Sequence, residues 1–384
     1  MRHRNTVLHG ILSHLPWHRF EAHVARHGTD KHVRTLTTKT QFTVMAYGQL
    51  CGAEGLRETV TRFAGHGPKL HHLGARPVAR STLAEANANR TSAVFEDLFR
   101  DLVAAADRRV RQALDGATYL IDSTSLKLNE RSSKWARFSA GVCGAKVHVV
   151  YDPDADCPIY AAFSTARVND ITAAKQMPIE AGATYVFDLG YYDYAWWARM
   201  HAAGCRIVTR LKKNTTLTFT RERLIEPGGP ILAERFGTLP ARQANNRHNP
   251  MSAEVREIDV RIDSGKVIRI VTNDLTAPAR EIADLYKRRW AIELHFRWIK
   301  QALEIRKFFG TSDNAVRTQV FIALIVFLLL RLAHAASKVT LSLLDFLRLA
   351  RAQVMERRDL PGLGEPAGPS TPDPRQASLD WAAA

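Results

Sequence analysis

The spacing of apolar residues divides the chain into a helical first part and a mixed second part. Over 36–63, apolar positions recur at the three- and four-residue spacing of helices, with a break near Gly52 and Gly55. From residue 118 onward, short apolar runs predict strands, which lie over 119–123, 146–152, 158–165, 184–188 and 206–210. Helical patterns between these strands lie over 170–179 and 194–203.

The rest of the chain interrupts this alternation and then returns to helices. Residues 215–273 contain further strand-like segments, separated by a stretch with glycine, proline and asparagine. Helices are then predicted from near Pro278 past Lys300, over 315–335 and over 341–357. The last residues are rich in proline, glycine and alanine, a composition typical of disorder.

Three strands, a helix, a strand, a helix, a fifth strand and a late helix follow each other in the order of an RNase H-like fold. We therefore expect an α/β protein with an RNase H-like catalytic core. The predicted parts are a helical N-terminal DNA-binding domain (1–105), the first part of the core (115–214), a β-rich insertion (215–273), the second part of the core (274–357) and a disordered tail (358–384).

The net charge of the chain favours one class of binding partner. Its 384 residues include 54 Lys and Arg against 38 Asp and Glu, which gives a formal net charge of +16. The apolar fraction of 46% can bury a large core and excludes an intrinsically disordered chain. The positive excess favours a nucleic-acid partner, because each Lys or Arg that meets a phosphate releases a counterion. A soluble basic protein without such a partner is the alternative.

Neither a membrane protein nor a cysteine-based site is indicated. The four cysteines form no CxxC pair, which argues against a zinc site or a disulfide framework and fits a reducing cytoplasm. The N-terminus lacks the apolar run of a signal peptide. The most apolar stretch, 320–330, is shorter than the ~20 residues of a membrane span, so we expect a buried core helix there.

The N-terminal helices have features of a DNA-reading domain. Ser81 is predicted as the N-cap of a helix, and Asn87, Asn89 and Arg90 are predicted to be exposed on it. Short helices, a glycine-containing turn and a polar helix start resemble a helix-turn-helix. Most helix pairs with a glycine turn are ordinary core, so the prediction of DNA contact depends mainly on the charge of the chain.

Two aspartates lie at the ends of predicted strands. Asp122 belongs to the first strand of the core, and Asp188 ends the fourth, which lies beside the first in an RNase H-like sheet. We therefore expect both carboxylates at one edge of the sheet, where oxygen ligands could hold two Mg²⁺ ions ~4 Å apart. Asp also commonly ends strands in turns, so neither residue identifies a site alone.

The late helix has a more specific pattern. On a helix of 3.6 residues per turn, Tyr286, Arg289, Glu293 and Lys300 fall within a sector of about 60°. This stripe could combine a metal-binding carboxylate with cations that hold the DNA backbone near the scissile phosphate. A solvated helix face with mixed charges is the alternative. Core packing is predicted for the tryptophans of the amphipathic helices, which are Trp196, Trp197, Trp290 and Trp298.

The spacing Tyr286-x2-Arg289-x3-Glu293-x6-Lys300 resembles the YREK signature of the IS4-family insertion-sequence transposases. Four fixed identities at fixed spacing occur by chance in roughly one chain of this length in several hundred. IDSTS and FDLGYYDY, which contain Asp122 and Asp188, resemble the family's motifs around its first and second catalytic aspartates. The β-rich segment also lies in the place of the family's insertion. The resemblance covers about residues 5–350.

The resemblance implies a DDE transposase that cuts DNA at element ends and transfers the strands into target DNA. Asp122, Asp188 and Glu293 would be its catalytic residues and would bind two Mg²⁺ ions, for which Mn²⁺ could substitute. DNA phosphates would be contacted by the other residues of the signature, Tyr286, Arg289 and Lys300. The implied partners are double-stranded DNA, as terminal inverted repeats and as target, and a second copy of the chain. The implied location is the bacterial cytoplasm, at the nucleoid.

Two other functions fit part of the pattern. Another RNase H-fold nuclease needs the same carboxylates without the YREK stripe. A DNA-binding relic without activity is disfavoured because all three acidic positions are intact.

Some members of the family place a flipped base on a Trp of the insertion while a DNA hairpin forms. Residues 211–273 contain neither Trp nor Tyr, and Phe219 and Phe236 are their only aromatics, so hairpin formation stays open.

Overall fold

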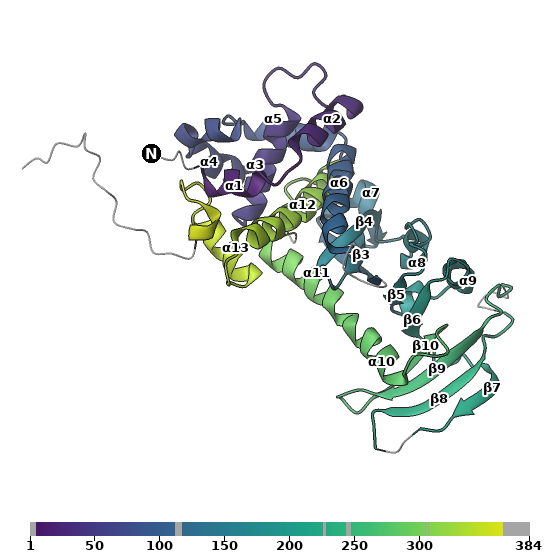
Figure 1. Ribbon diagram of the computed structural model, residues 1–384. Helices are drawn as coiled ribbons and strands as arrows, with labels where there is room; N and C mark the ends of the chain where they lie inside the picture. The colour runs from purple at the N-terminus through teal and green to yellow at the C-terminus, as the bar shows by residue number, and fades with distance from the viewer. Residues whose placement is uncertain are drawn as a thin grey trace, which may run out of the picture.

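The computed structural model describes residues 5–111, 117–225, 228–242, 247–303, 305 and 307–363, and it joins a group of helices to one large sheet (Figure 1). The helices that precede the sheet are α1 (Val7–Leu12), α2 (Trp17–His27), α3 (Thr38–Leu50), α4 (Leu56–Ala64), η1 (Gly67–Leu73), α5 (Arg80–Asn89) and α6 (Ala93–Arg111). The predicted helical break near Gly52 and Gly55 is confirmed, because it lies between the end of α3 and the start of α4.

The details predicted for α5 are partly wrong. The helix begins at Arg80 after Ala79, which has no side chain that could cap it, so Ser81 is not the N-cap. Asn87 is buried, and its Oδ1 accepts a hydrogen bond of 2.8 Å from Gln41 Nε2 of α3. Asn89 is exposed, as predicted. The buried amide pair holds α5 against α3, which leaves Asn87 unable to reach a base.

The first part of the sheet has the predicted order. Its strands are β1 (Thr118–Leu128), β2 (Arg137–Ser139), β3 (Val142–Asp152), β4 (Cys157–Thr165), β5 (Thr184–Phe187) and β6 (Arg206–Arg210). The short helical segments among them are η2 (Glu130–Ser132), α7 (Ser133–Ala136), α8 (Asp170–Ala174), η3 (Leu189–Tyr191) and α9 (Tyr194–Ala202). β1 pairs with β3 antiparallel and with β5 parallel. α8 is shorter than predicted because Pro178 disfavours helical backbone before it.

The β-rich segment extends this sheet. Its strands are β7 (Thr218–Arg223), β8 (Ile231–Thr238), β9 (Glu254–Arg261) and β10 (Val267–Thr272). β10 pairs antiparallel with β6, and the sheet runs in the order β2-β3-β1-β5-β6-β10-β9-β8-β7, with β4 beside β3. β8 lacks a clear apolar pattern in the sequence, because it buries the charged side chain of Glu234 against Arg256 of β9.

The chain then returns to helices: α10 (Ala279–Arg288), α11 (Trp290–Ala302), α12 (Asp313–Ser337), α13 (Leu343–Ala352) and the short η5 (Leu360–Gly362). The long helix predicted from Pro278 is divided at Arg289 into α10 and α11. α12 is long and apolar enough to cross a membrane, but 72% of its most apolar window is buried in the fold, as predicted for a core helix. Most of the predicted tail, 364–384, lies outside the described residues.

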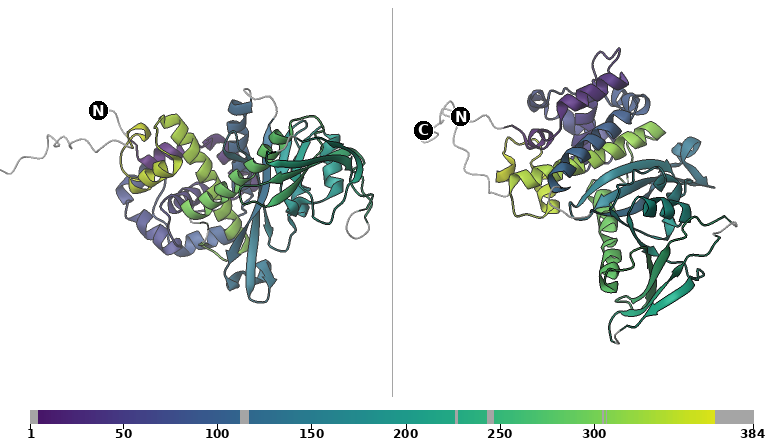
Figure 2. Two further views of the ribbon diagram at one scale, coloured as in Figure 1. Left: turned by 90° about the horizontal axis from the view of Figure 1, so that it is seen from below. Right: turned by 45° about the vertical axis from the view of Figure 1, so that its right-hand side comes forward.

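α12 lies between the N-terminal helices and the sheet-bearing part of the molecule (Figures 1 and 2). It packs against α3, α5 and α6 on one side and contacts α11 and α13. One contiguous apolar core therefore includes Phe95 of α6, Leu324 of α12 and Val149 of β3. The N-terminal helices and the sheet share this core, so they are fixed relative to each other.

Candidate active site

The pairing of β1 with β5 brings the two predicted aspartates to one edge of the sheet. The two strands run parallel, and Ile121 lies opposite Phe187 at the end of their paired segment. Asp122 and Asp188 follow these two residues, so they lie side by side where β5 ends, while β1 continues past Asp122 to Leu128. Each carboxylate is oriented by a backbone N–H: Ser123 N donates to Asp122 Oδ1 at 2.7 Å, and Gly190 N donates to Asp188 Oδ1 at 2.7 Å.

The YREK helix brings the third carboxylate to the same place. α11 packs on β1, and its buried apolar residues include Ile292, Phe296 and Ile299. Arg289, at the junction of α10 and α11, donates from Nη2 to Glu293 Oε1 at 2.6 Å, and its Nη1 lies 3.6 Å from Asp122 Oδ2. A guanidinium therefore bridges the first and third predicted catalytic residues.

The charges of the three carboxylates influence one another. Burial, to which the charges of Asp188 and Glu293 add, raises the pKa of Asp122 to about 6, while the Ser123 N–H and Arg289 act in the opposite direction. Within the described residues, no three His, Cys, Asp or Glu side chains are already close enough together to hold a metal ion. The donor set nevertheless suits Mg²⁺, since it consists of carboxylate oxygens around a position where Arg289 supplies the positive charge.

Tyr286 and Lys300 lie on either side of this group along the helix. Arg289 Cζ lies 5.9 Å from the centre of the Tyr286 ring. Burial raises the pKa of the Tyr286 hydroxyl. The charges of Arg289 and Arg210 lower this pKa, and the charge of Asp188 raises it, so the phenol lies near the second aspartate. Lys300 lines a small apolar cavity together with Thr124 of β1, so its stem lies over the sheet.

Several polar residues near the aspartates had no distinctive signal in the sequence. Asp170, the first residue of α8, accepts hydrogen bonds at Oδ1 from Ser123 Oγ at 2.8 Å and from Lys146 Nζ at 3.0 Å. His148 is fully buried beside them, and burial lowers its pKa to about 4. The alternation of side chains along β3 puts Lys146 and His148 on one face of the strand, but no comparable pattern in the sequence marks Asp170.

Tyr191 lies among the aspartates. Burial raises the pKa of its hydroxyl, and the charges of Asp122, Asp170 and Asp188 raise it further. A buried, neutral phenol is therefore in electrostatic contact with three carboxylates from three different elements. Asp170 thus belongs to the same neighbourhood as the two predicted catalytic aspartates, although it lies far from both in the sequence.

The prediction of core packing holds for two tryptophans and is wrong for one. Trp196 and Trp197 are buried in α9. Trp290 is 50% exposed at the start of α11, where Arg297 Cζ lies 5.9 Å from its ring centre. Trp298 is partly buried and packs edge-on against Phe327 of α12. Trp290 is the first residue of α11, so it lies at the end of the helix and not within its apolar face.

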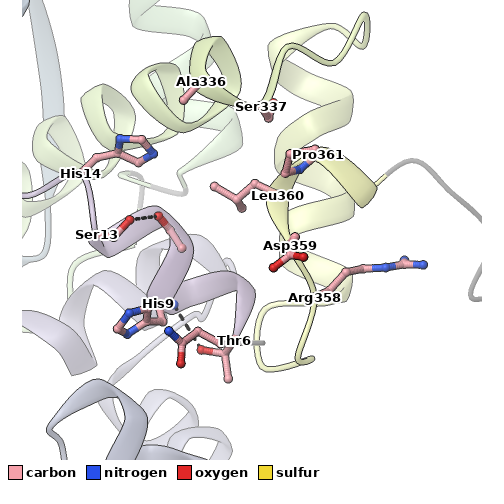
Figure 3. A pocket seen from close by; sticks show the side chains of 12 residues that line it. Thr6, His9, Ser13, His14, Ala336, Ser337, Arg358, Asp359, Leu360 and Pro361 are labelled. Carbon is pink, nitrogen blue, oxygen red and sulfur yellow. Dashed lines mark hydrogen bonds between the residues drawn. The ribbon is translucent and has the colours of Figure 1, made fainter. Parts of the chain in front are cut away.

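A pocket of about 420 Å³ lies elsewhere, where α1 meets the segment after α13 (Figure 3). His9 and His14 line one side of it, and Asp359 and Leu360 line the other. None of the predicted site residues lies in this pocket.

Comparisons with known proteins match both parts of the chain. The family described as "Transposase DDE domain" matches residues 114–329, and a domain of unknown function, DUF4372, matches residues 3–76. A Sinorhizobium fredii protein named as a transposase, y4zB, is 38% identical over 89% of this chain and 96% of its own length. A Geobacillus stearothermophilus protein named as the transposase for insertion sequence element IS5377 is 30% identical over 66% of this chain and 68% of its own length. A distant similarity exists to a solved piggyBac transposase synaptic complex with hairpin DNA, with a TM-score of 0.45 and 11% identity over 94% of this chain and 80% of that one.

Proposed function

Because this chain belongs to the family of DDE transposases, as an insertion-sequence transposase of the IS4 type, we propose that Asp122, Asp188 and Glu293 are the residues with which it cuts DNA. The observation that supports this assignment is the bridge from Arg289 to both Asp122 and Glu293, beside a second aspartate on the neighbouring strand. Three carboxylates from β1, the end of β5 and α11 thus converge on one edge of an RNase H-like sheet.

Enzymes of this family generally depend on divalent metal ions, and for this chain we propose two Mg²⁺ ions, with Mn²⁺ as a substitute. Bound there, the ions would lower the pKa of an attacking water or 3′ hydroxyl and stabilise the leaving oxygen of the phosphodiester. The residues of the chain hold and orient the ligands: the Ser123 and Gly190 N–H groups keep one oxygen of each aspartate fixed. Arg289 offsets the charges of Asp122 and Glu293, which would be two of the metal ligands.

We assign Arg289 to a phosphate of the DNA backbone as well, because the planar donor geometry of a guanidinium suits a phosphate oxygen. Tyr286 of α10 and Lys300 of α11 lie on either side of Arg289, and we assign them to neighbouring phosphates. In this assignment the helix holds the scissile strand over the carboxylates without reading its sequence.

Sequence recognition is assigned to the N-terminal helices, 1–105. The partner is double-stranded DNA, first as the terminal inverted repeats and then as the target, and the active assembly is a homodimer that pairs two ends. Family membership supports action on DNA, and the net charge of +16 supports contact with its backbone. The work of such an enzyme places it in the bacterial cytoplasm, at the nucleoid.

The test is single-turnover cleavage of DNA that carries the element's terminal repeat. Replacement of Asp122, Asp188 or Glu293 by Ala should abolish cleavage and leave end binding nearly intact, because binding depends on cationic contacts elsewhere. Asp284→Ala is the matched control, since Asp284 is an exposed carboxylate of α10 that pairs only with Arg280 of the same helix. Cleavage at the control rate by any of the three variants would remove that residue from the site.

The metal requirement is tested with the same substrate. Mg²⁺ and Mn²⁺ should support cleavage, whereas Ca²⁺ should support end binding only, because its longer and looser coordination does not hold the attacking and leaving oxygens in line. Full activity of the wild-type enzyme in a chelator would exclude the proposed metal chemistry.

A further inference from the structure

A second polar cluster lies on the face of the sheet opposite to α11. Neighbouring residues of a strand point to opposite faces, so Ser123 faces away from Glu293 when Asp122 faces toward it. Ser123 lies opposite His148 on β3, which puts both side chains on this second face. Asp170 of α8 reaches the same face and accepts the hydrogen bond from Ser123 Oγ. We call Ser123, Lys146, His148 and Asp170 the Asp170 cluster.

Asp170 accepts a hydrogen bond from one of the residues that orient the proposed catalytic aspartates and lies close to the other. Ser123, whose N–H holds Asp122, donates its hydroxyl to Asp170 Oδ1 at 2.8 Å. Gly190, whose N–H holds Asp188, lies against the other oxygen: a Cβ at Gly190 would be 3.4 Å from Asp170 Oδ2 and 3.0 Å from Asp188 Oδ1. A side chain at this position would therefore press against Asp188 and come into contact with Asp170.

Lys146 fixes Asp170 in this position. Its ammonium donates to Asp170 Oδ1 at 3.0 Å and to the Val168 carbonyl at 3.2 Å, which joins β3 to the segment before α8. The ion pair is only partly exposed, so the carboxylate of Asp170 remains compensated beside two other aspartates. The charge of Asp170 is therefore offset by Lys146, and its carboxylate lies between Ser123 and Gly190.

We propose that Asp170 is a positioning residue, which holds Ser123 and Gly190 so that Asp122 and Asp188 present their oxygens to the metal ions. Asp170 acts through these two neighbours and does not bind metal itself. The inference rests on the proposed assignment of Asp122 and Asp188 as metal ligands. Partners that orient metal ligands typically account for a tenfold to hundredfold effect on metal affinity or activity, roughly the size expected here.

The test uses the full chain and measures Mn²⁺ binding to the free protein by electron paramagnetic resonance, together with cleavage at increasing Mn²⁺. Asp170→Ala should raise the dissociation constant for Mn²⁺ about tenfold and shift the Mn²⁺ requirement of cleavage by a similar factor, with end binding unchanged. Ser123→Ala should act in the same direction, because it removes the same contact. Asp170→Asn keeps an acceptor for Ser123 Oγ, so it should show a smaller shift and provides a folded variant.

Asp193→Ala is the matched control. Asp193 also pairs with a lysine, Lys175, at 2.8 Å and accepts a backbone N–H from Trp196 at 2.9 Å, but its partners do not orient Asp122 or Asp188. Its loss should lower the melting temperature and leave the Mn²⁺ dissociation constant unchanged. If Asp170→Ala and Asp193→Ala had the same effect on Mn²⁺ binding, Asp170 would have only a structural role and the inference would be wrong.

The catalytic role of Asp122 and the positioning role of Asp170 are contradicted by different results. If Asp122→Ala abolishes Mn²⁺ binding and cleavage while Asp170→Ala and Ser123→Ala change neither, the inference is overturned and the catalytic assignment stands. If Asp122→Ala itself leaves Mn²⁺ binding and cleavage intact, the catalytic assignment is overturned and the inference with it.

Discussion

Asp122 is partly buried, and its surroundings in the metal-free fold disfavour the ionised form of its carboxyl group. Its pKa is raised from the ordinary 3.8 to about 6, mainly by burial, with Asp188 and Glu293 adding to the effect. Since the folded pKa lies above the unfolded one, the unfolded chain releases this proton first. Stability is therefore lost as pH rises from about 4 to about 6, and the full loss persists above that window. A bound metal ion would reverse this cost, which explains why such a residue can be retained.

Asp122→Asn should consequently stabilise the metal-free protein. In a chelator at pH 8, we expect the free energy of unfolding to rise by about 2 kcal/mol, a value reduced for the part of the side chain that solvent reaches. The gain should shrink toward zero at pH 4, where the wild-type carboxyl is protonated in the folded state. Urea unfolding at both pH values measures this difference.

Asp193→Asn should change the free energy of unfolding in the opposite direction. Burial alone would raise the pKa of Asp193, but hydrogen bonds from Lys175 and from the Trp196 N–H outweigh it and lower the pKa. The ionised carboxylate of Asp193 adds to the free energy of unfolding at neutral pH, and this contribution is lost as pH falls. Asp193→Asn should therefore be less stable than the wild type at pH 8. A stabilising Asp193→Asn or a destabilising Asp122→Asn at pH 8 would contradict this account of the two environments.

At the scale of elements, the junction between α10 and α11 places three kinds of side chain on one side of a helix. Arg289 lies at the junction itself, with helical backbone angles, so the stripe predicted from an unbroken helix is preserved. Tyr286 lies one turn before it, and Glu293 one turn after it. The apolar side of α11 packs on β1 and fixes the direction in which the stripe faces.

Removal of the cations of this stripe should slow cleavage without changing which sequence is recognised. Arg289→Ala and Lys300→Ala should each reduce the salt dependence of active-complex formation by about one counterion, if each side chain meets a phosphate. Tyr286→Phe should be milder, because it removes one neutral hydrogen bond of roughly 1 kcal/mol. The measurement is cleavage rate against salt concentration on a pre-paired end substrate.

Lys287→Ala is the control for this series. Lys287 lies on the same helix outside the stripe, is largely exposed and pairs only loosely with Asp263 at 3.7 Å. Its loss should leave the cleavage rate nearly unchanged. Unchanged rates and slopes for both Arg289→Ala and Lys300→Ala would mean that the stripe is a solvated helix face with no role in DNA contact.

At the scale of the whole molecule, α12 determines how the parts are joined. The helix packs against α3, α5 and α6, and Phe321 on it meets Phe99 of α6 with ring centres 6.1 Å apart. The N-terminal helices therefore bury their apolar faces on a helix that the chain provides more than 200 residues later. Recognition of DNA ends and cleavage are expected to be rigidly linked as a result.

A fragment of residues 1–105 should consequently not fold as an independent unit. Without α12 its apolar face has no partner, so we expect reduced helicity and no cooperative thermal transition by circular dichroism, whereas the full chain should melt cooperatively. Addition of a peptide with the sequence of α12 should restore part of the helicity. A cooperative transition of the fragment alone would show that the N-terminal helices are a separate domain.

The sequence by itself determined the class of fold and the family, and it supplied the three carboxylates that we propose as catalytic. The period of the apolar residues specified the strands of the core, because a buried strand and an amphipathic helix each bury a fixed face. The fixed spacing of the YREK residues, together with the motifs around Asp122 and Asp188, indicated an IS4-type transposase, and the family comparisons confirm it. These features are local, so they can be read within single segments of the chain.

Only the tertiary structure decided what depends on contacts between distant segments. It placed Asp170 between Ser123 and Gly190, continued the β-rich segment into the sheet of the core, and buried Asn87 against α3 while it left Trp290 exposed. No local pattern encodes these outcomes, because each depends on which surface the rest of the chain presents. Burial and polar pairing are set by the packed neighbours of a residue, and those neighbours are known only when the elements are assembled.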